Sequence, residues 1–127
     1  DPEVAQWVET FEKESCFIDI GANIGIYSLY AAYNKAKVYS FEPESLNFSC
    51  LNLNISDNRF NDRIIAFPIA ISDKTDISVL NLSKVTFGGS GHSFDRKITD
   101  SGNSFESIFK QGSISCTLDD VIDKFEI

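Results

Sequence analysis

The chain alternates short apolar runs with segments in which apolar residues recur every three or four positions. Runs such as "CFIDI" and "KVYSF" have the length of buried strands, whereas the segments between them have helical spacing. Alternating strands and helices predict a parallel sheet built from right-handed crossovers. The expected strands are residues 16–20, 37–41 and 62–72, and the expected helices are residues 3–13, 24–34 and 45–55.

The pattern changes after residue 72. Residues 76–82 ("DISVLNL") predict an additional strand suited to antiparallel pairing, and residues 86–104, rich in Gly, Ser and Asp, predict a long mobile loop. The chain ends with "SISCTLDDVIDKF", which predicts a short strand and then a helix capped by Thr117. Asp119 and Asp120 fall in the positively polarised first turn of that helix, so we interpret them as helix-start charges rather than a metal pair.

Composition and charge narrow the class of protein. A chain of 127 residues is one domain at most, and it is long enough for a single core. The formal net charge of -8 argues against nucleic-acid partners and against anionic membrane surfaces. No apolar stretch approaches the ~20 residues of a membrane span, and the N-terminus lacks the layout of a signal peptide.

The three cysteines, Cys16, Cys50 and Cys116, do not have the spacing of metal ligands. We expect buried, reduced thiols in a cytoplasmic protein.

Two glycines interrupt "FIDIGANIGIYSLYAAY", residues 17–33, where the first strand should meet the next helix. Such a turn places backbone N–H groups opposite a ligand, and a glycine lets the ligand approach closely. The spacing of Gly21 and Gly25 does not match a dinucleotide fingerprint, because Asn23 and Ile26 stand where that motif has glycines. The lysine of a phosphate-binding P-loop is absent as well, so the sequence disfavours a phosphate-binding turn.

Glu42 ends the second predicted strand, about twenty residues after Gly21. An acidic residue at this place can accept hydrogen bonds from both hydroxyls of a ribose. By itself Glu42 would be interpreted as a solvated carboxylate at a strand end. Together with the glycine turn it predicts a nucleoside-type cofactor without a pyrophosphate, and S-adenosylmethionine fits that description.

Four segments in this order resemble the FkbM family of S-adenosylmethionine-dependent methyltransferases. They are "FIDIGANIGIYSLYAA", "VYSFEPESLNFSCLNLNI", "IIAFPIAISDKT" and "CTLDDVI", which together cover most of residues 16–122. The resemblance implies a Rossmann-like methyltransferase fold, three-layer α/β/α with a mainly parallel sheet. It also implies methyl transfer to a hydroxyl of a sugar or another small molecule, so the expected partner is a small-molecule or glycan acceptor.

The resemblance further implies which residues hold the cofactor, although it leaves residues 88–94 ("GGSGHSF") without a role. The implied set is Asp19, Gly21, Ala22, Asn23 and Gly25 for the methionine part, Glu42 for the ribose, and Pro43, Ala70 and Ile71 for the adenine.

The chain departs from the family in one respect. The family continues after "TLDDVI" with a strand of the form Ile-Lys-Ile-Asp-x-Glu-Gly, whereas this chain ends at Ile127. We therefore expect residues 1–127 to be one partial domain, the cofactor-binding half, truncated after the third strand and an added β segment, and inactive alone. The strand at 16–20 would then have an open edge that favours a homodimer. The alternatives are a catalytically silent nucleoside-binding fragment and a nicotinamide-dependent domain.

The sequence does not identify a catalytic residue or a metal ligand. His92 is the only histidine, and we interpret it as a loop residue rather than a general base, because no orienting partner can be recognised. Tyr27, Tyr30 and Tyr33 recur at helical spacing and are expected to pack against a neighbouring helix.

Overall fold

A parallel three-stranded sheet forms the centre of the computed structural model, which describes residues 1–90, 92–94 and 108–127. Its strands are β1 (Cys16–Ile20), β2 (Lys37–Phe41) and β3 (Ile64–Phe67), in the order β1-β2-β3. Ile20 pairs with Phe41, and Phe41 pairs with Phe67, so the three carboxyl ends lie at one edge. The strands predicted at 16–20 and 37–41 are confirmed residue by residue.

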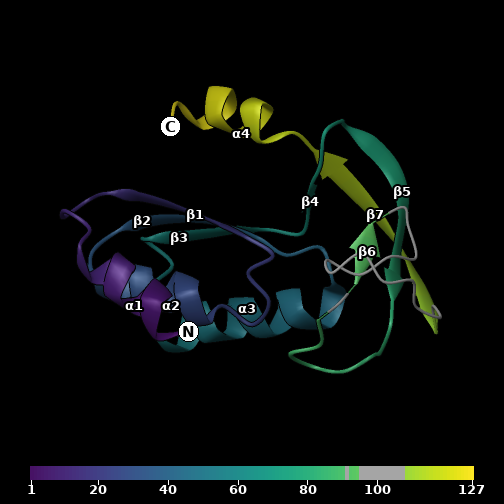
Figure 1. The fold of residues 1–127 in the computed structure, drawn as a ribbon, viewed down its shortest axis with the longest axis horizontal. Coiled ribbons are helices and arrows are strands. Elements are labelled where there is room, and N and C mark those ends of the chain that lie inside the picture. Colours follow the sequence, from purple (N-terminus) through teal and green to yellow (C-terminus); the bar gives the residue numbers. More distant parts are fainter. Residues whose placement is uncertain (91, 95–107) are drawn as a thin grey trace.

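Helices cover both faces of this sheet (Figure 1). Three of them, α1 (Pro2–Glu9), α2 (Ile26–Tyr33) and α3 (Ser45–Asp57), lie on one face, and α4 (Leu118–Phe125) lies on the other. The ring of Phe125 in α4 lies 5.5 Å from that of Tyr39 and 5.4 Å from that of Phe67, centroid to centroid. The predicted α/β/α layering is therefore confirmed.

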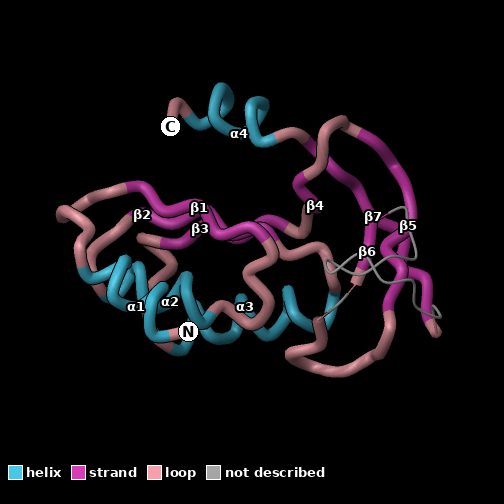
Figure 2. Tube along the Cα trace, viewed as in Figure 1, coloured by secondary structure: helices cyan, strands magenta, loops and turns pink. Residues whose placement is uncertain are grey.

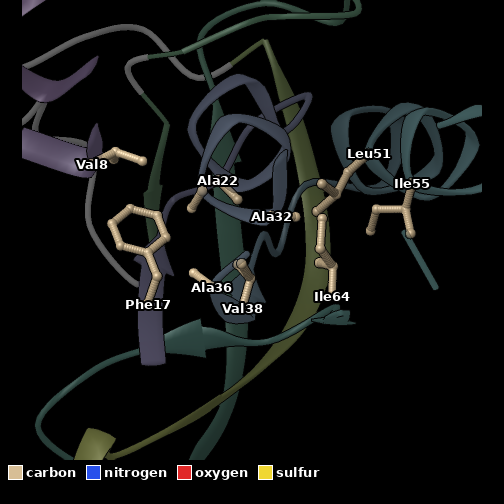
Figure 3. Packing of buried hydrophobic residues seen from close by; sticks show 10 residues of the cluster. Val8, Phe17, Ala22, Ala32, Ala36, Val38, Leu51, Ile55 and Ile64 are labelled. Carbon is tan, nitrogen blue, oxygen red and sulfur yellow. The ribbon is translucent and has the colours of Figure 1, made fainter. Parts of the chain in front are cut away.

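The main core lies between the sheet and the first three helices, and Figure 3 shows its packing. Val8 of α1 and Leu51 of α3 are fully buried, and they pack in one cluster with Phe17 and Val38 from the sheet. Burying a side chain of this size stabilises the fold by roughly 1.5–3 kcal/mol. The other buried members of the cluster are Ala22, Ala31, Ala32, Ala36, Ile55 and Ile64.

A second, mixed sheet lies beyond the carboxyl ends of the parallel strands (Figure 2). It contains β4 (Ala70–Ile71), β5 (Asp76–Leu82), β6 (Ser93–Phe94) and β7 (Phe109–Cys116), in the order β4-β7-β5-β6. The strand β5 runs antiparallel to both β6 and β7, as the sequence predicted for residues 76–82.

The single strand predicted over residues 62–72 is wrong. The chain leaves the first sheet after Phe67, and Ala70 of β4 pairs instead with Ser115 of β7. Pro68 lies at the break, and a proline cannot donate a hydrogen bond to a strand ladder. This break carries Ala70 and Ile71 into the second sheet.

Other predicted boundaries also differ, most clearly those of the first helix and of the last strand. The first helix ends at Glu9 rather than at residue 13. Directly after Glu9, the Thr10 hydroxyl donates to the Trp7 carbonyl at 2.6 Å, and this side-chain hydrogen bond competes with continuation of the helix. The last strand begins at Phe109, earlier than expected. Residues 93 and 94 of the predicted loop form β6, whereas residues 91 and 95–104 lie outside the described part of the chain.

Several local predictions can be compared with side-chain contacts. The Thr117 hydroxyl caps α4, accepting from the Asp120 N–H at 3.1 Å, so that prediction is confirmed. Tyr27 and Tyr30 bond to Asp1 and to Glu9 of α1, as expected for packing on a neighbouring helix.

The solvent exposure of Tyr33 and of the cysteines differs from what the sequence predicted. Tyr33 is 68% exposed, so the packing predicted for it is wrong. The three cysteines are free, but Cys16 is exposed rather than buried, and Cys50 and Cys116 are only partly buried.

In the described sheet β1 forms an edge, since it pairs only with β2. Phe17 is buried beneath the helices, whereas Ile20 is 52% exposed. The homodimer expected from an open edge remains a prediction. Among the described residues, no helix has the length and apolar character needed to cross a membrane.

Candidate functional site

A cavity of about 240 Å³ lies where the carboxyl ends of β1 and β2 meet the second sheet. Ligands of open parallel sheets bind in this position, beyond the carboxyl ends of the strands. One wall comes from the glycine turn and the end of β2, and the other comes from β4, β5 and the loop before β6. The lining residues are Ile20, Gly21, Asn23, Phe41, Glu42, Pro43, Glu44, Ile69, Ala70, Ile71, Leu80, Gly89, Ser90 and His92.

The two glycines of the turn serve different purposes. Both have a left-handed backbone, with φ of +73° at Gly21 and +97° at Gly25. A Cβ at Gly21 would meet no heavy atom within 4 Å, so the space beside this cavity-lining residue is open. A Cβ at Gly25 would lie 2.5 Å from Cδ1 of the buried Leu51. The clearance at Gly25 therefore admits helix α3 rather than a ligand.

The N–H groups of the turn are largely used within the protein. Those of Gly21 and Ala22 donate to the Phe41 carbonyl at 2.8 and 3.0 Å. The Asn23 N–H donates to Oε2 of Glu42 at 2.8 Å, and the Gly25 N–H donates to the Ala22 carbonyl at 2.9 Å. The expectation that these groups point toward a ligand is therefore wrong, because they fasten the turn to the end of β2.

Glu42 is buried at the junction of the two sheets, with 6% of its surface exposed. Its Oε2 accepts from Asn23, and its Oε1 accepts from the Glu44 N–H at 3.0 Å. Burial raises the pKa of Glu42, and the two backbone hydrogen bonds oppose that shift, while the charges of Glu44 and Asp19 add to it. A carboxylate has about four acceptor positions, so Glu42 retains acceptor capacity toward the cavity.

Glu44 is a lining residue that sequence reasoning missed. Its carboxylate caps α3, accepting from the Leu46 N–H at 3.1 Å and the Asn47 N–H at 2.7 Å. Its place directly before a predicted helix was a signal that it could be a cap. Beside it, the Pro43 carbonyl accepts from Nε2 of Gln111 at 2.7 Å, which ties the end of β2 to β7.

Asp19 supports the site from behind rather than lining it. The Ser28 hydroxyl donates to its Oδ2 at 2.6 Å and also lies 2.7 Å from the Ser40 hydroxyl. Burial raises the pKa of Asp19, and the Ser28 hydrogen bonds oppose the shift. This polar chain links β1, α2 and β2 directly beneath the turn.

The loop before β6 closes the far side of the cavity. The Asn47 side chain accepts from the Gly88 N–H at 2.7 Å and donates to the Gly89 carbonyl at 2.8 Å. The Asn23 side chain donates to the same Gly89 carbonyl at 3.1 Å. This arrangement, the amide clamp of Asn23 and Asn47 on Gly88 and Gly89, holds the loop against the turn and α3.

The structure thus brings most of the predicted cofactor residues to one cavity. Three of the nine do not line it: Asp19 and Ala22 are buried beneath the turn, and Gly25 faces α3. His92, which the sequence analysis interpreted as a loop residue rather than a general base, also lines the cavity. The predicted residues that do line the cavity are Gly21, Asn23, Glu42, Pro43, Ala70 and Ile71. Among the described residues, no group of His, Cys, Asp or Glu side chains could hold a metal ion.

Several solved structures resemble this chain. FkbM, a methyltransferase from Methylobacillus flagellatus KT, shares 21% identity over 87% of this chain and 23% of its own, with a TM-score of 0.50. A candidate rRNA methylase from Clostridium thermocellum shares 15% identity over 54% of this chain and 41% of its own, also with a TM-score of 0.50. PRMT6 shares 25% identity over 51% of this chain, with a TM-score of 0.48. No protein-family model and no curated protein matches the chain.

The chain has the Rossmann-like fold of methyltransferases, with the added mixed sheet described above. It spans about a fifth of the length of PRMT6 and of FkbM, and about two fifths of the Clostridium protein.

Proposed function

We propose that this chain provides the cofactor-binding half of an S-adenosylmethionine-dependent methyltransferase of the FkbM type. The observation that carries the proposal is the buried Glu42 carboxylate at the end of β2, which lines a cavity opposite Ala70 and Ile71. A carboxylate in this position suits the two hydroxyls of a ribose, and the apolar wall suits a purine.

The other cavity residues fit the same cofactor. Open space beside Gly21 allows the methionine part to approach the backbone, and Pro43 extends the wall beyond the ribose carboxylate. When bound, S-adenosylmethionine would supply an electrophilic methyl group. The residues of this chain would bind and orient it, with Glu42 held in place by the N–H groups of Asn23 and Glu44.

The hydrogen bonds of the turn disfavour the nicotinamide alternative. Dinucleotide sites place a pyrophosphate against free N–H groups at a helix N-terminus. Here the N–H groups of Gly21, Ala22, Asn23 and Gly25 already have protein acceptors. S-adenosylmethionine has no pyrophosphate that would need these four donors.

For the acceptor we propose a hydroxyl of a sugar or another small molecule. Glu42 and Glu44 line the cavity, and the whole chain carries a formal net charge of -8. Such a site repels polyanions, so a phosphate-rich acceptor would be bound against its electrostatic field. Neutral sugars meet no such repulsion.

Isothermal titration calorimetry with S-adenosylhomocysteine and with NAD tests the cofactor. We expect the first ligand to bind and the second to give no heat of binding. The Gly21→Val variant should lose S-adenosylhomocysteine binding, because the new side chain would occupy open space beside the cavity. Absence of binding by the wild type, or tighter binding of NAD, would overturn the proposal.

A further inference from the structure

His92 has an unusual environment in the cavity wall. Both ring nitrogens are buried, and neither has a hydrogen-bond partner among the described residues. A buried polar atom without a partner has lost its hydrogen bonds to water and gained none in return, so folded proteins rarely leave one unpaired. His92 lines the cavity, so a ligand that draws its ring toward the cavity on binding would supply the missing partner.

A second unpaired atom lies on the same wall. Oδ1 of Asn23 is buried and lacks a partner within the described part of the chain, while Nδ2 of the same amide donates to the Gly89 carbonyl. A Cβ at Gly89 would lie 3.3 Å from Nε2 of His92, so His92 adjoins the same glycine. Two unsatisfied polar side chains therefore meet at Gly89, beside the cavity that both of them line.

We propose that His92 is a binding residue for the nucleoside part of the cofactor, held in place by the amide clamp on Gly88 and Gly89. This inference rests on the proposed function, which places the ribose at Glu42. It extends the site to a loop that the resemblance left without a role.

The position of His92 favours the nucleoside end over the methionine end. His92 lines the same cavity as Glu42 and as Glu44, two residues further along the chain. β6 starts one residue after His92 and pairs with β5, whose Leu80 also lines the cavity. His92 therefore approaches from the side of the apolar wall.

The imidazole is suited to hydrogen bonding in its neutral form. Burial lowers the pKa of His92, the negative charge of Glu44 opposes that shift, and the positive charge of Lys84 adds to it. A neutral imidazole offers one N–H donor and one acceptor nitrogen. It can therefore hydrogen-bond to both the acceptor and the donor groups of a nucleoside.

Because the chain has a single histidine, its imidazole resonances can be followed by NMR without assignment ambiguity. Adenosine and S-adenosylhomocysteine should each shift the ring signals on titration, whereas methionine alone should leave them unchanged. Saturation with S-adenosylhomocysteine without any movement of these signals would overturn the inference.

Affinity measurements on loop variants provide an independent test. His92→Ala should bind S-adenosylhomocysteine about tenfold more weakly, the equivalent of one hydrogen bond, and His92→Gln should lose less. Phe87→Ala is the matched control, since Phe87 lies in the same loop, is 63% exposed and does not line the cavity. Thermal unfolding of each variant checks that it is folded.

The outcomes separate the two proposals. If the wild type and His92→Ala bind S-adenosylhomocysteine with equal affinity, the role of His92 is contradicted and the proposed function stands. Failure of the wild type to bind S-adenosylhomocysteine would overturn the proposed function and this inference with it.

Discussion

The parallel sheet and the mixed sheet differ in how they are stabilised. Beneath the parallel sheet, α1, α2 and α3 bury a continuous apolar cluster that includes Val8 and Leu51. In the mixed sheet, Ile77 and Ile114 face each other across β5 and β7, yet they are 83% and 51% exposed. The first region is a packed core, whereas the second buries Leu80 and Leu82 of β5 but leaves this isoleucine pair exposed, so it gains less from burial.

The site joins these unequal regions. The packed region supplies the turn and Glu42, which neighbouring N–H groups hold in place. The mixed sheet and its loop supply the covering wall, fastened by the side chains of Asn23, Asn47 and Gln111. The comparison indicates that the packed region supplies the buried carboxylate of Glu42 and that the mixed sheet shapes and closes the cavity; under the proposed function, the packed region would position the cofactor.

The largest difference between the two regions in the free energy of unfolding is expected when a glycine of each is replaced by valine. Gly25→Val should lower the free energy of unfolding by about 2–5 kcal/mol, since it combines a left-handed backbone with a clash against Leu51. Gly112→Val in β7 should change it by no more than about 0.5 kcal/mol, because a Cβ there meets nothing within 4 Å. Urea denaturation measures both, and equal losses would contradict the comparison.

Glu42→Ala should weaken S-adenosylhomocysteine binding by roughly ten- to a hundredfold, since hydrogen bonds to a charged group are worth about 1.5–3 kcal/mol. It should also destabilise the fold by about 1–3 kcal/mol, because the N–H groups of Asn23 and Glu44 lose their acceptor.

Calorimetry and denaturation measure the two effects of changing Glu42 separately. Glu42→Gln should lose less affinity, since one acceptor oxygen remains. Glu12→Ala, which removes an exposed carboxylate, is the control. Parental affinity in both Glu42 variants would mean that the carboxylate only fastens the turn.

Lowering the pH should weaken cofactor binding, whereas it should make the contribution of Glu42 to folding stability more favourable. The pKa of Glu42 is raised by burial and by the charges of Glu44 and Asp19, so its carboxylate takes up a proton above the usual glutamate range. Protonation removes acceptor capacity for ribose hydroxyls, so affinity should fall as pH falls through the raised pKa. Folding stability depends on pH in the opposite direction. Because the pKa of Glu42 is raised in the folded state, this group stabilises the fold at low pH, and that stabilisation is lost as pH rises through the raised pKa.

A calorimetric pH series between about pH 4.5 and 7.5 tests this dependence around the usual glutamate and histidine values. The Glu42→Gln variant should flatten the part of the profile that Glu42 causes. An identical profile in that variant would assign the pH dependence to another group.

The smallest effect should come from the exposed isoleucine pair. Ile77→Thr and Ile114→Thr should each change the free energy of unfolding by no more than about 0.5 kcal/mol, since threonine retains the β-branched shape that strands favour. Leu51→Ala, in the packed region, should cost about 2–5 kcal/mol by leaving a cavity. Losses above 2 kcal/mol at Ile77 would show that this face is covered in solution.

Features that depend on neighbours along the chain could be predicted from the amino-acid sequence. The apolar runs at Cys16–Ile20 and Lys37–Phe41 give the bounds of β1 and β2, and Thr117 begins α4 as a cap. Glu42 could be singled out because its place after a strand is a local feature. Such features follow from periodicity and from capping chemistry within a few residues.

Contacts between residues far apart in the sequence became visible in the three-dimensional fold alone. Leu51 takes the space that Gly25 seemed to offer a ligand, and the Asn23 N–H is paired with Glu42. The pairing of β5 with β6 and the amide clamp bring His92 to the cavity wall. These contacts join residues twelve or more positions apart in the sequence. They are selected by packing and by hydrogen-bond geometry, which the pattern of neighbouring residues does not reveal.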